Sequence, residues 1–348
     1  EVVPDSGCGS WLWEPQSTNL LLQSNQFNTT WIKTLATITS DEIAAPISGE
    51  MADSVLATAT NGGHRVLQAP STSGVGTFTM YIKQKELSRI CVHFLGANKA
   101  AGFDCSDNTT FAAAGIAAYP TRYNISDFGN GWSKVEMYDV GSTTRVDIYI
   151  ANPTVGGNNA TWIGDGTSKI YFSAAQFEIG SYATSYIPTS GSTVTRNQDL
   201  CTNGGSLASI NSTEGVLYAE IAALRETNDN VQFLSLGSGS YTSNSVYLQL
   251  RAAPNQFAVW AYSNNLNQLA DVFNVTDITD FNKIAISYKL NDFKVYVNGS
   301  VVYTNTTYTP PTDNSLNVLE FTRDGGSPFF GKTKALAVWK EALSDEEL

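Results

Sequence analysis

The stretch that most constrains the fold of this chain covers residues 282–303. It contains two runs in which apolar and polar side chains alternate, residues 284–288 (IAISY) and 293–297 (FKVYV), separated by a short polar turn. The pair Asn298-Gly299 follows at once and leads into a third apolar run. Because a type I′ turn needs positive φ at both central residues, Asn-Gly is the strongest short hairpin signal. The stretch therefore predicts a three-stranded antiparallel meander.

The rest of the chain repeats this strand pattern. Short alternating runs are separated by clusters of Gly, Asn, Asp, Ser and Pro, and no long helical period occurs. For 348 residues, two domains are the natural expectation. We predict an all-β chain of two tandem antiparallel β-sandwiches. It would comprise an irregular N-terminal arm (1–27), a first sandwich (28–190), a polar linker (191–212) and a second sandwich (213–348).

Two apolar features fall outside the predicted sandwiches. Trp11, Trp13 and the leucine run at residues 20–22 in the arm require burial, and we expect them to pack the arm against a sheet of the first sandwich or against a neighbouring subunit. Cys201 and Leu207 lie in the otherwise polar linker, which indicates that the linker is partly docked.

The composition indicates an extracellular or virion protein. Charged residues make up 15% of the chain, against a typical value of about 25%, and Ser, Thr, Asn and Gly take their place. A net charge of −12 repels phosphate backbones, so nucleic acid is not an expected partner. No apolar run approaches the roughly 18 residues of a membrane-spanning segment. The chain begins at Glu1, so we expect a processed protein or a piece of a longer one.

The four cysteines leave two alternatives open. Cys91 and Cys105 flank a predicted hairpin that turns near residues 97–101, which favours a disulfide between them, and Cys8 would then pair with Cys201. Four free thiols are an equally good interpretation. No CxxC pair is present and the chain has only two histidines, so a zinc site is not expected.

No catalytic constellation is recognisable in the sequence. Polysaccharide hydrolases need two carboxylates at a fixed separation, and the E-x-D-x-x-E strand that typically supplies them is missing. Glu136 and Asp139 are three residues apart, so on a strand they point to opposite faces. His93 lies within a predicted strand, where a structural role is expected. The sequence therefore predicts a protein that is not an enzyme.

Candidate binding residues are aromatic. Sugar binding needs exposed aromatic rings with planar polar partners beside them. Trp162, in a Gly- and Asn-rich loop, and Trp260 and Tyr262, on one predicted strand, are the candidates for carbohydrate binding. Trp132 opens a strand after a turn, and we expect it to be buried.

No cofactor is required by the sequence, and calcium is the one alternative left open. Calcium takes carboxylate and carbonyl oxygens from loops. Asp292, Asp313 and Asp324 lie in predicted turns or loops and are the candidate ligands. Isolated loop aspartates mostly cap turns, however, so a turn role is the default expectation for each.

Three segments resemble known families. The meander and the closing segment, residues 330–348, resemble laminin-G-like domains of the concanavalin A-like lectin superfamily, over about residues 213–348. Residues 11–27 (WLWEPQSTNLLLQSNQF) resemble the opening of many tailed-phage tail and virion proteins. Residues 162–189 resemble the end of carbohydrate-binding-module-like jelly rolls in phage proteins, over about residues 23–196.

These resemblances imply a non-catalytic, adhesive or structural subunit of a bacteriophage virion: a head fibre, a tail fibre or a decoration protein. It would lie at the virion surface or outside the cell and form a homo-oligomer, with a trimer as the leading expectation. It would contact other virion proteins and host surface glycans, with many weak sites acting together. The alternatives are a secreted polysaccharide-degrading enzyme with a binding module, and a bacterial surface adhesin or filament subunit.

Overall fold

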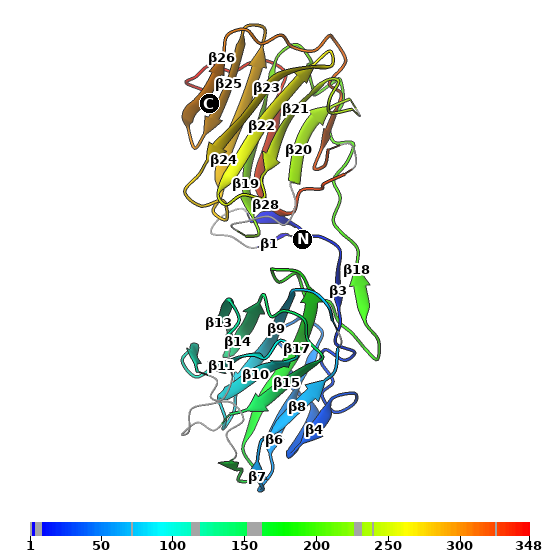
Figure 1. Ribbon diagram of the computed structural model, residues 1–348, viewed down its shortest axis with the longest axis vertical. Helices are drawn as coiled ribbons and strands as arrows, with labels where there is room; N and C mark the ends of the chain where they lie inside the picture. Colours follow the sequence, from blue (N-terminus) through cyan, green and yellow to red (C-terminus); the bar gives the residue numbers. More distant parts are fainter. Residues whose placement is uncertain are drawn as a thin grey trace. The chain divides into compact units, whose positions relative to one another are not determined.

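The computed structural model describes residues 2–3, 9–70, 72–112, 119–151, 162–225, 232–238, 240–323 and 326–348 (Figure 1). Within these ranges every regular element is a β-strand and the strand pairs are antiparallel, so the predicted all-β fold class is confirmed. No helix that could cross a membrane occurs among the described residues. The chain forms two compact units. The central unit is Gln16–Asn197, and the terminal unit combines Glu1–Pro15 with Gln198–Leu348.

The central unit contains two six-stranded sheets. The first has the order β13 (Arg122–Gly129), β14 (Trp132–Tyr138), β9 (Gly76–Gln84), β17 (Lys169–Ile179), β6 (Met51–Ala57) and β5 (Ala36–Ala44). The second has the order β12 (Thr109–Phe111), β11 (Lys99–Asp104), β10 (Arg89–Leu95), β15 (Arg145–Ile150), β8 (Arg65–Gln68) and β4 (Ile32–Thr34). Two short pairs complete the unit, β7 (Asn61–Gly62) with β16 (Trp162–Ile163) and β3 (Ser17–Asn19) with β18 (Val194–Arg196).

The core of the central unit follows the alternation of its strands. Phe78, Met80 and Ile82 share one face of β9, as the sequence predicts, and all three are fully buried. Val146 and Ile148 do the same on β15. Trp132 is 3% exposed, which confirms that it is buried, although it packs in a separate small cluster on the other face of its sheet.

A buried asparagine holds the start of the central unit to its end. Asn19 is fully buried, and its amide makes four hydrogen bonds with backbone groups. Its Nδ2 donates to the carbonyls of Ala175 (3.2 Å) and Ile187 (2.9 Å), and its Oδ1 accepts from the N–H groups of Leu21 (3.2 Å) and Phe177 (3.1 Å). The side chain thus fills its full capacity of two donors and two acceptor sites.

Glu178 extends this connection. Its side chain is 1% exposed, and its carboxylate accepts hydrogen bonds from neutral donors. The donors are Ser17 Oγ, Gln176 Nε2 at 3.0 Å, and Thr184 N and Oγ1 at 2.8 and 2.7 Å. The segment before the first predicted sandwich, around residues 17–21, and the end of that sandwich, around residues 176–187, therefore interlock in one buried polar network.

The terminal unit contains a seven-stranded and a five-stranded sheet. The first has the order β1 (Val2–Val3), β2 (Ser10–Trp13), β28 (Gly331–Trp339), β19 (Gly215–Ala223), β24 (Asn282–Lys289), β25 (Asp292–Val297) and β26 (Ser300–Asn305). The second has the order β23 (Leu266–Asn274), β22 (Gln256–Ser263), β21 (Ser245–Leu250), β20 (Gln232–Gly237) and β27 (Val318–Glu320). Their inward residues form one hydrophobic core.

The predicted meander is confirmed as β24, β25 and β26. Asn298 and Gly299, in the second turn, have φ values of 52° and 79°. Both values are positive, as the type I′ interpretation of this pair requires.

The N-terminal arm differs from the prediction. Strand β2 pairs with β28, and the Trp13 ring lies 4.7 Å from the ring of Phe321 in the core of the terminal unit. The expectation that the arm packs against the first sandwich is therefore wrong for Trp13, whereas Leu21 and Phe27 of the same arm are fully buried in the core of the central unit, as predicted. The physical reason is that β28 would otherwise expose an unpaired sheet edge, and β2 covers it. Trp11 remains 52% exposed.

The predicted linker is largely part of the terminal unit. Gly204 exchanges backbone hydrogen bonds with Leu319, and the Cys201 carbonyl accepts one from the N–H of Phe321. Ile210 is 2% exposed in the core. The predicted partial docking therefore holds for Cys201, whereas Leu207 remains largely exposed.

The predicted Cys91–Cys105 disulfide is wrong, because both thiols are free. The hairpin of β10 and β11 exists, but its register places Cys91 opposite Gly102, and Cys105 lies beyond the end of β11 with its Sγ donating to the carbonyl of Ser88 at 3.1 Å. Burial raises the pKa of the Cys91 thiol well above its usual value, and burial with a contribution from Asp104 raises the pKa of Cys105 to about 12. Cys201 is also free, and the predicted partner Cys8 lies outside the described residues.

Candidate functional site

Two of the predicted binding residues lie on the outer face of the five-stranded sheet of the terminal unit. Strands β21 and β22 alternate strictly, so their apolar residues face the core while Tyr247, Gln249, Trp260 and Tyr262 point away from it. Tyr241, in the turn before β21, lies against them. We call Tyr241, Tyr247, Trp260 and Tyr262 the aromatic platform.

The rings of the platform have a common orientation. The Tyr247 ring centroid lies 6.2 Å from that of Trp260 and 6.5 Å from that of Tyr262, and the ring planes are within 13° and 11° of parallel. Tyr241 stands at 81° to Tyr247 and at 90° to Tyr262, with centroids 6.3 Å away in both cases. Three rings are therefore nearly parallel: Tyr247 is buried, the Trp260 and Tyr262 rings stacked against it are partly exposed, and Tyr241 closes one side of the group.

Polar groups of fixed geometry border these rings. The Trp260 indole Nε1 donates to Gln249 Oε1 at 2.9 Å, which orients the Gln249 amide in the sheet face. The Arg323 guanidinium carbon lies 4.1 Å from the ring centroids of both Phe233 and Tyr241. Arginine so placed is held by cation–π contacts on two sides, while its N–H groups can still donate to a ligand.

The charge state of the platform is simple at neutral pH. Burial raises the pKa of the Tyr247 phenol above its ordinary value, and the nearby Tyr262 adds to this. Tyr247 therefore remains a neutral hydroxyl, and it accepts a hydrogen bond from Arg323. Arg323 contributes the positive charge beside it.

This arrangement can bind a sugar ring. The aliphatic C–H face of a pyranose packs on an aromatic ring, and its hydroxyls need donors and acceptors at the rim. Trp260, Tyr262 and Tyr241 are all partly exposed and can supply the ring face. The Gln249 amide, the phenols and Arg323 supply the polar partners.

The third predicted aromatic residue lies elsewhere. Trp162 is in the central unit, where its ring packs on that of His64 at 4.7 Å and 69°. The His64 ring nitrogens face the carbonyls of Leu35 (2.6 Å) and of Trp162 itself (3.1 Å). Trp162 is therefore not part of the aromatic platform.

Two of the three predicted calcium ligands, Asp292 and Asp313, lie among the described residues. Asp292 begins β25, 3.8 Å from Lys294 Nζ, and Asp313 lies in the loop before β27. Asp324 lies outside the described residues. Where the structure describes the chain, no group of three or more His, Cys, Asp or Glu side chains is arranged to hold a metal ion.

The terminal unit matches a known protein family. Residues 206–348 match the laminin G model described as the concanavalin A-like lectin/glucanases superfamily. This match agrees with the resemblance seen in residues 213–348 and confirms a laminin-G-like domain there. No curated protein matches the chain in sequence.

Several solved structures are similar to the chain, among them the following. The CBM40 module of Ruminococcus gnavus IT-sialidase bound to α2,3-sialyllactose has 18% identity and a TM-score of 0.32, over 39% of this chain and 80% of the module. Sheep galectin-11 in complex with glycerol has 10% identity and a TM-score of 0.28, over 40% of this chain and 97% of the galectin. Domains LG4-5 of the mouse laminin α1 chain have 9% identity and a TM-score of 0.28, over 81% of this chain and 86% of the laminin fragment.

Proposed function

We propose that this chain is a non-catalytic, glycan-binding subunit of a bacteriophage virion, and that the aromatic platform of the terminal unit is its glycan-binding site. The observation that carries the proposal is the set of three parallel rings bordered by Gln249 and Arg323. The laminin G match over residues 206–348 supports a lectin-like role for the same unit.

The virion assignment rests on sequence. The two segments that resemble phage proteins, residues 11–27 and 162–189, are also those that contribute to the buried network of Asn19 and Glu178. This gives a physical reason for their occurrence together in one chain. We propose an extracellular position at the virion surface, assembly with other virion proteins and a homo-oligomer, a trimer first, in which many weak sites act together by avidity.

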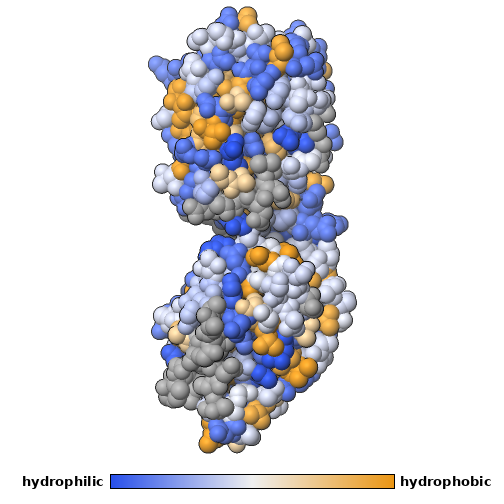
Figure 2. All heavy atoms as spheres, viewed as in Figure 1, coloured by the Kyte–Doolittle hydropathy of each residue, from blue (hydrophilic) through white to orange (hydrophobic). Residues whose placement is uncertain are grey.

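The face of the molecule in Figure 2 is consistent with a protein that meets polar partners. Hydrophobic residues on this face gather in small patches that polar residues separate. Large contiguous apolar patches mark many protein–protein interaction sites, and none is evident among the coloured residues of either unit in this view. Recognition by a few rings with polar neighbours does not require such a patch.

Glycan binding is tested by array screening of the full chain and of three variants. Trp260→Ala and Tyr262→Ala each remove a ring of the platform, and Trp11→Ala removes a tryptophan that is exposed in the same unit but lies on the seven-stranded sheet. We expect wild type and Trp11→Ala to bind the same glycans equally well and both platform variants to bind them more weakly. Equal binding by all four proteins would contradict the platform assignment.

The virion assignment is tested by immunogold labelling of purified phage particles and uninfected cells of one culture. Gold on heads or tails supports the proposal. Gold on uninfected cell surfaces would overturn it in favour of a bacterial adhesin. Release of reducing ends or unsaturated sugars from host polysaccharide, lost on carboxylate substitution, would overturn the non-catalytic part.

A further inference from the structure

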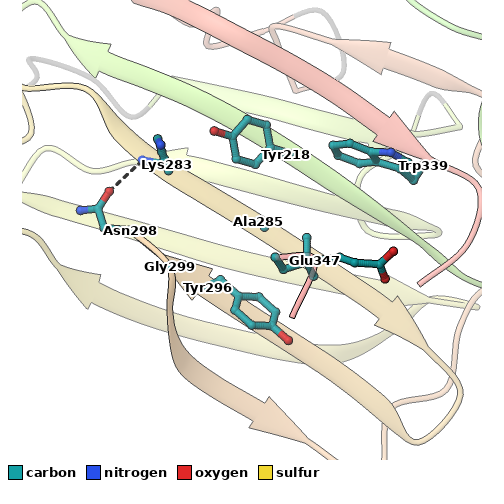
Figure 3. A pocket seen from close by; sticks show the side chains of 9 residues that line it. Tyr218, Lys283, Ala285, Tyr296, Asn298, Gly299, Trp339 and Glu347 are labelled. Atoms are coloured by element: carbon teal, nitrogen blue, oxygen red, sulfur yellow. Dashed lines mark hydrogen bonds between the residues drawn. The ribbon is translucent and has the colours of Figure 1, made fainter. Parts of the chain in front are cut away.

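The seven-stranded sheet of the terminal unit does not bear the aromatic platform, but its outer face carries a recess. Tyr218 on β19, Ala285 on β24 and Tyr296 on β25 occupy directly paired positions on three neighbouring strands. Their side chains therefore project from the same face in one row. Because the middle residue is an alanine, a gap opens between the two tyrosines (Figure 3).

The C-terminal segment bounds this gap. Leu343 and Leu348 pack against the same cluster as Ala285 and Tyr296. Asp345 fixes the segment by accepting from the Tyr296 hydroxyl at 2.7 Å and from Lys294 Nζ at 2.5 Å. The result is a trough of about 420 Å³, which we call the C-terminal trough.

The walls of the trough are aromatic. The Trp339 ring lies 6.3 Å from the Tyr218 ring at 74°, so the two form an edge-to-face pair along one side. Tyr296 forms the other side, and Ala285 lies on the floor between them (Figure 3). Trp339 is 39% exposed, so part of its ring is accessible to a ligand in the trough.

The polar groups of the trough are of two kinds. Lys283 is exposed, and among the described residues no carboxylate lies within ion-pair distance of its Nζ. Glu347 accepts hydrogen bonds from the N–H and Oγ of Ser344 at 2.9 and 2.8 Å, which hold the pKa of its carboxyl below the ordinary value. The trough thus has a charged donor in Lys283 and a charged acceptor in Glu347.

We propose that the C-terminal trough is a second saccharide site that takes a neutral pyranose. A sugar hydroxyl both donates and accepts, so one ring can satisfy Lys283 and Glu347 together while its C–H faces pack on the tyrosines. A ligand carboxylate would be repelled by the carboxylate of Glu347, and a ligand ammonium group would be repelled by that of Lys283. The volume lies at the low end of the range of about 300–1,000 Å³ for small-molecule sites, which suits one or two sugar units.

This site makes the terminal unit bivalent, with one site on each of its two sheets. Such an arrangement lets a single copy bridge two glycan chains and adds to the avidity of an oligomer. The inference stands independently of the platform, because the two sites share no residue.

The test uses the full chain in a Trp260→Ala background, which disables the platform and leaves the trough intact. The probes are the methyl glycosides of glucose, galactose, mannose and N-acetylglucosamine, and binding is measured by saturation-transfer NMR. We expect at least one probe to bind in the millimolar range. Lys283→Ala and Glu347→Gln, both at exposed positions, are then expected to weaken it about tenfold, equivalent to about 1.4 kcal/mol. Lys289→Ala, an exposed lysine at the other end of β24, is the matched control.

The outcomes separate the two sites. If Trp260→Ala abolishes binding of every probe that the wild type binds, the trough proposal is overturned and the platform stands. If binding survives Trp260→Ala unchanged and is lost in Lys283→Ala, the trough stands and the platform fails. Binding that survives both trough variants at full strength also overturns the trough, as does the absence of any binding by the wild type.

Discussion

Asn19 offers a stringent test of how the central unit is held together. In Asn19→Ala, the buried N–H groups of Leu21 and Phe177 lose their acceptor, and the carbonyls of Ala175 and Ile187 lose a donor. A buried, unsatisfied N–H group costs about 1–3 kcal/mol, so the two donors alone give about 2–6 kcal/mol. For a unit of this size, the middle of that range lowers Tm by about 10 °C.

The assay is differential scanning calorimetry of the full chain, together with thiol labelling of Cys91 to identify the transition of the central unit. Asn124→Ala is the matched control, since Asn124 is an exposed asparagine of the same unit, and a change below about 0.5 kcal/mol is expected there. We expect the central-unit transition to fall and that of the terminal unit to stay. A loss below about 1 kcal/mol in Asn19→Ala would refute the network as a source of stability.

Three further predictions follow from individual contacts. Hydrogen bonds from Lys85, Ser54 and Lys169 hold the pKa of Glu42 at about 2, below its usual 4.5. The ionised Glu42 therefore stabilises the fold fully above pH 4.5, and this stabilisation is lost as the pH falls through about 2. The difference in urea midpoint between wild type and Glu42→Gln should shrink over that pH range, and a constant difference would contradict the prediction. Burial raises the pKa of the Cys91 thiol, so iodoacetamide should modify Cys91 only after unfolding, as measured by mass spectrometry, and rapid labelling of the native protein would count against this. Asn298→Ala places alanine at a φ of 52° and should cost about 1 kcal/mol in chemical denaturation, whereas Asn28→Ala, at an exposed position of the central unit, should cost little.

The sequence predicted the local features of the fold well. Residues 282–303 combine alternating apolar and polar side chains with Asn298-Gly299, a pair strongly preferred in type I′ turns, and the meander forms as predicted. The β10–β11 hairpin was also predicted, but its register was not, and the register decides whether Cys91 meets Cys105. Register depends on which faces are buried and on the turn geometry, which spacing alone does not specify.

The contacts between distant segments could not be predicted from the sequence. Strand β2 pairs with β28, which lies more than 300 residues later in the chain, and no pattern in residues 10–13 indicates this pairing. The platform shows the same limit. Trp260 and Tyr262 were predicted as candidates from their own strand, whereas Tyr247 and Arg323 join them only through sheet pairing and packing. A detectable signal existed for Tyr247, because residues 245–250 alternate with Tyr and Gln on the outward face.

The most direct test of the central claim is a titration of the full chain with a glycan identified on the array. Because a central aromatic residue of a binding site typically contributes 2 kcal/mol or more, we predict that Trp260→Ala weakens binding about 30-fold. Trp11→Ala should bind as the wild type does. Equal affinities for wild type and Trp260→Ala would contradict the assignment of the aromatic platform as the glycan-binding site.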